Sequence, residues 1–188
     1  MFIQTESTPN PATLKFLPGE TVLGRGTADL PDAGAAAKSP LARRIFAVPG
    51  VAGVFLGSDF VTVTKGADVE WDHIKPAILG AVMDHFQSGD PVMVETGAPA
   101  ASAHAAHDGE DAVIVEQIKE LLDTRVRPAV AQDGGDITFH GFDRGVVYLH
   151  MQGACAGCPS STLTLKMGIE NLLRHYIPEV TEVRPVAA

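Results

Sequence analysis

The chain has 188 residues, of which 45% are hydrophobic and 20% charged, a composition typical of a globular protein with one or two domains. Its 14 basic residues against 23 acidic residues leave a formal net charge of −9, which disfavours binding to nucleic acid or to an anionic membrane. No apolar run approaches the roughly 20 residues that a transmembrane helix needs. The first residues resemble neither a secretory signal nor an arginine-rich transit peptide, so we expect a cytosolic protein whose thiols stay reduced.

The first half of the chain is predicted to contain strands and two helices. In chain order, we expect a strand at 13–17, a loop at 24–37, a helix at 41–47, a hairpin of strands 51–55 and 60–64, and a helix that begins near Trp71. Ser39 and Pro40 are typical of an N-cap followed by proline at the first helical position.

A stretch between residues 95 and 109 divides the chain. It is rich in alanine and small polar residues and has no large apolar side chain, so it predicts a flexible linker. We therefore expect two domains, residues 1–94 and residues 110–188. Each places a hairpin between two helices, which predicts an α+β fold with helices packed on a small sheet.

The second half also places a hairpin between two helices, but its residues do not match those of the first half, so we predict no internal repeat. We expect a helix that carries Ile114 on its apolar face and ends before Gly134, a hairpin of strands 137–142 and 146–152, a helix after Pro159, and a last strand at 180–186.

The only two cysteines, Cys155 and Cys158, lie between a predicted strand and a predicted helix, in the sequence GACAGCP. Pro159 suits the first helical turn, which places Cys158 near the positive end of the helix dipole, where a thiolate is favoured. Gly153 and Gly157 allow tight turns that expose backbone N–H groups to sulfur.

Three interpretations of this pair remain open on spacing alone. The cysteines could be structural thiols, a redox pair, or half of a metal site. Two thiolates cannot complete the four-coordinate sphere of zinc or of an iron–sulfur cluster, but two chains related by a two-fold axis would supply four. The Cys–Pro pairing favours iron–sulfur over zinc only weakly.

Two sequence signatures resemble one known family. Residues 126–137 (VRPAVAQDGGDI) and 153–162 (GACAGCPSST) resemble the C-terminal domain of NifU-like proteins of the Nfu type. Residues 4–11 (QTESTPNP) and 59–65 (DFVTVTK) resemble the N-terminal domain of the same family. The resemblance covers nearly the whole chain except the predicted linker.

This resemblance implies an iron–sulfur cluster scaffold or carrier that is not an enzyme. Family members hold a [4Fe–4S] cluster between two subunits and pass it to apo-proteins, so Cys155 and Cys158 would be the metal ligands of each chain. The implied partners are a second copy of the chain, cluster-assembly machinery as donor and apo iron–sulfur proteins as recipients. The alternative is a dithiol–disulfide oxidoreductase that uses the same two cysteines.

The resemblance also bears on location. Eukaryotic members of the family are mitochondrial and carry a presequence, whereas this chain starts almost at the first signature. We therefore expect a bacterial cytoplasmic protein.

Other polar residues are given simpler roles. His104 and His107 are expected to be solvated in the linker, and His140 to lie on an exposed strand face. Asp133 and Asp136 are expected to serve in turns and caps.

Overall fold

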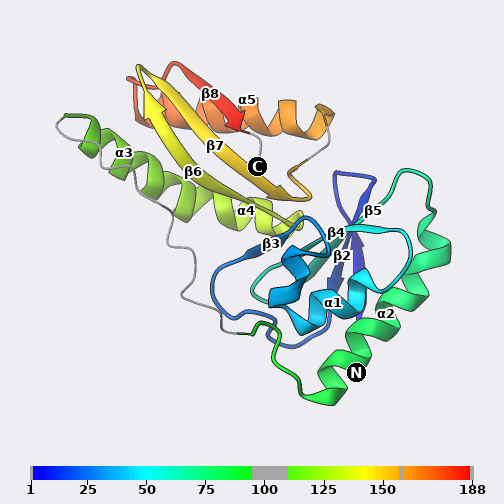
Figure 1. Cartoon of the computed structure of the whole chain (residues 1–188). Helices are drawn as coiled ribbons and strands as arrows, with labels where there is room; N and C mark the ends of the chain where they lie inside the picture. The colour runs from blue at the N-terminus through cyan, green and yellow to red at the C-terminus, as the bar shows by residue number, and fades with distance from the viewer. Residues whose placement is uncertain (1, 95–109, 157–158, 187–188) are drawn as a thin grey trace. The chain divides into compact units, whose positions relative to one another are not determined.

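The computed structural model describes residues 2–94, 110–156 and 159–186. Residue contacts divide the chain into two compact units, Met1–Pro99 and Ala100–Ala188 (Figure 1). The predicted linker at 95–109 lies outside the described residues, so the domain boundaries remain a prediction. The predicted α+β class with two domains is confirmed, because each unit combines helices with its own sheet.

The first unit is a five-stranded antiparallel sheet with two α-helices. Its elements are β1 (Gln4–Ser7), β2 (Thr13–Leu17), β3 (Ala28–Leu30), η1 (Ala35–Lys38), α1 (Pro40–Phe46), β4 (Val51–Leu56), β5 (Val61–Lys65) and α2 (Trp71–Ser88). The strand order is β1-β2-β5-β4-β3. Buried residues of both helices share one core with the inward side chains of the central strands.

Local sequence signals account for most of this unit. The Ser39 side chain accepts a hydrogen bond of 3.1 Å from the Ala42 N–H, and Pro40 opens α1, as predicted. The predicted loop at 24–37 is wrong in part, because it contains β3 and the short helix η1. Strand β3 is three residues long and exists through its pairing with β4, a contact that local sequence does not encode.

The second unit is a three-stranded sheet with helices packed on it. Its elements are α3 (Glu110–Leu121), η2 (Leu122–Val126), α4 (Arg127–Gln132), β6 (Gly135–Asp143), β7 (Val146–Gly153), α5 (Pro159–Tyr176) and β8 (Glu182–Val186). β7 lies in the middle, antiparallel to β6 and parallel to β8.

Only one face of this sheet is deeply buried. Val147, Leu149 and Met151 alternate along β7 and join one core with the buried side chains of α3 and α5, among them Ile118 and Leu173. The helices therefore cover the same face of the sheet. The end of β7 and the start of α5 meet at the edge of this core, where the first cysteine lies.

The helix before the predicted turn is interrupted by a π-helical turn, η2. Pro128 has no N–H to donate to the carbonyl four residues earlier, and the wider π turn precedes it. The segment ends at Gly134, whose φ of 80° is the left-handed conformation expected there. In the part of the chain that the structure describes, no helix is both long and apolar enough to cross a membrane.

Candidate functional site

Cys155 lies in the turn that directly follows β7. Gly153 takes a φ of 62° and redirects the chain, and the Ala156 N–H donates to the Gly153 carbonyl at 3.1 Å. The Ala154 N–H donates to the Gly134 carbonyl at 3.2 Å, which joins this turn to the start of β6. The turn is therefore held at both ends by backbone hydrogen bonds.

The Cys155 side chain is buried against Gly135. Only 5% of Cys155 is exposed, and it belongs to the core of the second unit. A Cβ on residue 135 would overlap the Cys155 sulfur and would lie 2.9 Å from both the Cys155 nitrogen and the Gln152 oxygen. Glycine at position 135 therefore makes room for the sulfur.

The surroundings of Cys155 favour the protonated thiol. Burial, as the largest cause, and the negative charges of Asp133 and Asp136 together raise the pKa of Cys155 to about 12. Positive potential at a helix N-terminus was predicted for Cys158, which lies outside the described residues. Pro159 does begin α5, as predicted.

Arg127 holds one of the two carboxylates next to this thiol. Its Nε donates to Asp136 Oδ1 at 2.9 Å and its Nη2 donates to Asp136 Oδ2 at 2.8 Å. Asp136 is only 2% exposed, and its Oδ1 also accepts from the Ile137 N–H at 2.8 Å. Hydrogen bonding to Asp136 is the first cause that raises the pKa of Arg127. A bidentate pair of this kind fixes both partners in orientation.

This ion pair was not predicted. Asp133 caps the end of α4, which agrees with the predicted capping role, but Asp136 is a buried partner of Arg127. The sequence offered one signal for this pair, an arginine nine residues before an aspartate that follows two glycines. Spacing alone does not show that the two side chains meet, since α4 and the turn at Gly134 lie between them.

The described residues bring one thiol to the site. No group of three or more His, Cys, Asp or Glu side chains with metal-binding geometry occurs among them. His140 is exposed on β6, as predicted, whereas His104 and His107 lie outside the described residues.

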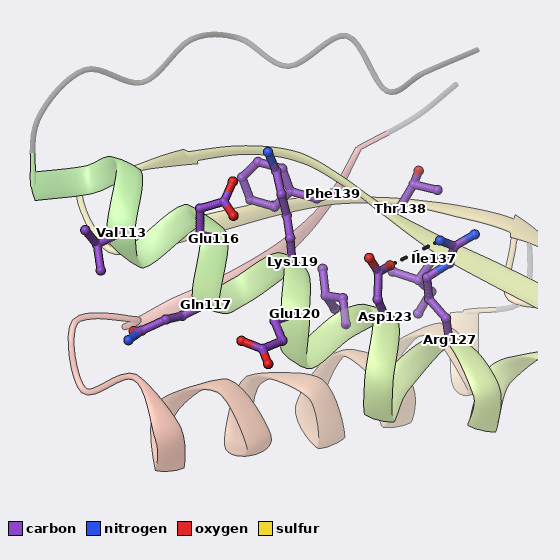
Figure 2. A pocket seen from close by; sticks show the side chains of 11 residues that line it. Val113, Glu116, Gln117, Lys119, Glu120, Asp123, Arg127, Ile137, Thr138 and Phe139 are labelled. Carbon is purple, nitrogen blue, oxygen red and sulfur yellow. Dashed lines mark hydrogen bonds and ion pairs between the residues drawn. The ribbon is translucent and has the colours of Figure 1, made fainter. Parts of the chain in front are cut away.

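A separate cavity of about 620 Å³ lies between α3, η2 and β6 (Figure 2). Arg127 lines it and donates to Asp123 at 3.1 Å, and the Lys119 ammonium lies 5.5 Å from the centre of the Phe139 ring. Cys155 does not line this cavity. Ile137 also lines the cavity and belongs to the core that contains Cys155, so the cavity adjoins the cysteine site without including its thiol.

Two family models match the chain, one to each unit. Residues 3–89 match the N-terminal domain of the scaffold protein Nfu/NifU, and residues 118–184 match the NifU-like domain.

Relatives that match nearly the whole of this chain support the same family. The chain is 56% identical over 185 residues to NifU-like protein 5, mitochondrial, of Arabidopsis thaliana, which covers 97% of this chain and 67% of the relative. It is 53% identical over 187 residues to the NFU1 iron-sulfur cluster scaffold homolog, mitochondrial, of Drosophila erecta, which covers 99% of this chain and 65% of the relative. The chain thus spans about two thirds of the length of these relatives.

A solved structure of a NifU-like protein from Saccharomyces cerevisiae is 30% identical, covers 50% of this chain and 86% of that chain, and has a TM-score of 0.46.

These relatives contradict the prediction of a bacterial cytoplasmic protein, because they are named mitochondrial. That prediction rested on where this sequence starts, and this does not decide the location of a protein. Both family models and these relatives agree on one assignment. The chain belongs to the NifU-like, Nfu-type family of iron–sulfur cluster scaffold proteins.

Proposed function

We propose that this protein holds a [4Fe–4S] cluster between two copies of the chain and delivers it to apo-proteins, without acting as an enzyme. The observation that carries the proposal is that each chain has only two cysteines, Cys155 and Cys158, within a scaffold family. Four thiolates are needed to hold such a cluster, so two chains must contribute to one site.

The setting of Cys155 fits a cluster that is carried as cargo. Without metal, burial and two neighbouring carboxylates keep the thiol protonated. A bound metal ion reverses this balance, because its positive charge deprotonates a coordinating thiol and offsets the nearby negative charge. Without a cluster the Cys155 thiol is therefore unreactive, and it ionises when the cluster binds.

The raised pKa of Cys155 also favours release of the cluster. A recipient's thiolates would displace Cys155 and Cys158 from iron by ligand exchange. The displaced Cys155 thiolate then takes up a proton, which its raised pKa favours, and the thiol returns to its buried place beside Gly135. Protonation therefore opposes rebinding of the cluster that has just left.

The oxidoreductase alternative is disfavoured by this chemistry. A catalytic dithiol needs an accessible cysteine with a lowered pKa, because the thiolate is the nucleophile. Cys155 is 5% exposed, and its pKa is raised to about 12.

We infer that the donor of the cluster is an assembly machinery and that the recipients are apo iron–sulfur proteins.

Anaerobic reconstitution with iron and sulfide tests the proposal. We expect a brown dimer with about four irons per two chains, and loss of both iron and dimer in Cys155→Ser or Cys158→Ser. His140→Gln, on an exposed strand position, is the matched control and should keep the cluster. A colourless metal-containing dimer would indicate zinc, and an iron-free monomer that reduces disulfides would overturn the proposal.

A further inference from the structure

The outer surface of α5 has a face without any charged side chain. This α5 face consists of Leu163, Thr164, Met167, Gly168 and Asn171, which are all exposed and form two rows spaced four residues apart. Large apolar side chains on it are open to solvent, with Leu163 58% exposed and Met167 57% exposed. An isolated exposed apolar residue is ordinary, but two on adjacent turns of one helix form a contact surface.

The charged residues of α5 are directed elsewhere. Lys166 forms an ion pair with Glu182 of β8 at 3.8 Å, and the Glu170 carboxylate accepts from the Val183 N–H at 3.2 Å. Arg174, one turn further on, pairs with Glu170 at 3.6 Å. Lys166 and Glu170 therefore lie along the β8 side of the helix, and the exposed Arg174 pairs with Glu170 one turn beyond the α5 face.

Packing against the described residues does not explain Gly168. It lies inside a helix, where glycine is less favourable than alanine, and its φ is not in the left-handed region. A Cβ built at this position meets no atom of the described residues within 4 Å, so none of these neighbours requires glycine. The missing side chain leaves room for a second backbone to approach this turn of α5 closely.

We propose that the α5 face is the surface on which a second copy of this chain packs when the two share a cluster. The inference rests on the proposed function, because α5 begins at Pro159, next to Cys158. Two copies that combine their cysteines must meet at this end of α5. With a rise of 1.5 Å per residue, Leu163 lies about 6 Å and Met167 about 12 Å along the helix from Pro159.

Charge supports a second copy as the occupant. Each chain carries a formal net charge of −9, so two copies repel each other over most surfaces. A neutral face beside the shared ligands lets them approach without bringing like charges together. The contact is self-complementary, since a two-fold axis places the same face on both sides.

The size of the face predicts a weak contact. Stable interfaces bury about 800 Å² per partner, or about 20 residues, and the α5 face has only five. The face therefore assists the cluster in holding the dimer and does not replace it. Removal of the cluster leaves a dimer that dissociates readily.

Sedimentation velocity on the full chain, with and without reconstituted cluster, tests the inference. The double variant Leu163→Ser, Met167→Ser should raise the dissociation constant of the loaded dimer about tenfold or more. Val113→Ser on α3 is the matched control, because Val113 is 62% exposed in the same unit, and it should leave the constant unchanged. Thermal melting of the unloaded chains verifies that the variants fold.

The variant Gly168→Ala distinguishes an effect on the contact between the two copies from an effect on the stability of the fold. Alanine should raise the melting temperature of the unloaded chain, because it favours the helix. The same change should weaken the loaded dimer, because its methyl group keeps the two helices apart. A purely structural role for position 168 would move both measurements in the same direction.

The outcomes distinguish this inference from the proposed function. If the wild type forms a cluster-bridged dimer whose dissociation constant is unchanged in both variants, the inference fails and the proposed function stands. If the variants keep the dimer but lose cluster transfer to an apo-ferredoxin, the face serves recipients and the inference is overturned. If the wild type binds no cluster, the proposed function fails with it.

Discussion

Arg127 and Asp136 form a two-fold hydrogen-bonded ion pair, with distances of 2.9 and 2.8 Å, that ties the start of α4 to the start of β6. Asp136 is nearly inaccessible, so the pair holds a buried negative charge beside Cys155. Arg127 thus keeps in place both the carboxylate and the backbone on which the cysteine turn rests.

Replacement of Arg127 by Met should destabilise the second unit by about 3 kcal/mol, because it leaves the buried Asp136 carboxylate without its cation. Chemical denaturation followed by circular dichroism measures the effect. Asp123→Asn is the control, since Asp123 pairs with the same arginine but its side chain is 62% exposed. That change should cost less than about 1 kcal/mol. Equal effects for the two variants would contradict the structural importance of the buried pair.

Gly135→Ala should displace the cysteine turn, because the added methyl group overlaps the Cys155 sulfur. We expect a loss of about 1–3 kcal/mol in the free energy of unfolding and a lower iron content after reconstitution. Gly141→Ala on the same strand is the control, because a Cβ there meets no atom within 4 Å. Normal cluster loading of Gly135→Ala would show that the buried place of the sulfur does not matter.

Cys155 in the unloaded protein should react slowly with iodoacetamide. With a pKa of about 12, roughly one molecule in ten thousand carries the thiolate at pH 8, against a large fraction for an ordinary thiol. Alkylation rates of the Cys158→Ser variant between pH 6 and pH 10, folded and in urea, measure this difference. Folded and unfolded rates that agree at pH 8 would contradict it.

The Cys155 thiol should make the free energy of unfolding depend on pH. Its pKa is higher in the folded than in the unfolded state, so the folded state retains the proton between about pH 8.5 and pH 12. The stabilisation is fully present below this range and is lost as the pH rises through it. Denaturation of wild type and Cys155→Ala at pH 7.5 and pH 10 should show the loss only in the wild type.

His85 should make the first unit sensitive to acid. It is fully buried in α2, and neither ring nitrogen has a hydrogen-bond partner among the described residues. The pKa of His85 is lowered, mainly by burial and also by the positive charge of Arg44, while the negative charge of Asp90 acts in the opposite direction. Because the unfolded state binds the proton more readily, stability is present above the unfolded pKa of about 6.5 and falls as the pH drops below it.

His85→Leu should flatten this decline between pH 7.5 and pH 5. The exposed His73 on the same helix provides the control, and His73→Gln should leave the decline as in the wild type. Thermal melting across this pH range measures both variants. A decline that persists in His85→Leu would assign the acid sensitivity to other groups.

Much of the fold follows from local sequence. The apolar spacing in α2 and the cap at Ser39 are short-range signals, and the structure confirms the elements that they predict. The turn at Arg144 and Gly145, with φ values of 49° and 83°, closes the predicted hairpin; Gly145 adopts the left-handed region without a steric penalty, whereas Arg144 adopts it at a cost. Strand β3 escaped prediction because its pairing with β4 is not local.

The sequence by itself determined the two-domain α+β architecture, the family signatures and the scarcity of cysteine, which makes a site shared by two chains the natural proposal for Cys155 and Cys158. Only the tertiary structure decided that Cys155 is buried beside Gly135 with a raised pKa. The physical reason is that burial and electrostatic potential depend on segments that meet through folding. Local spacing reports which residues share a strand or a helix, but not which carboxylates will surround a sulfur.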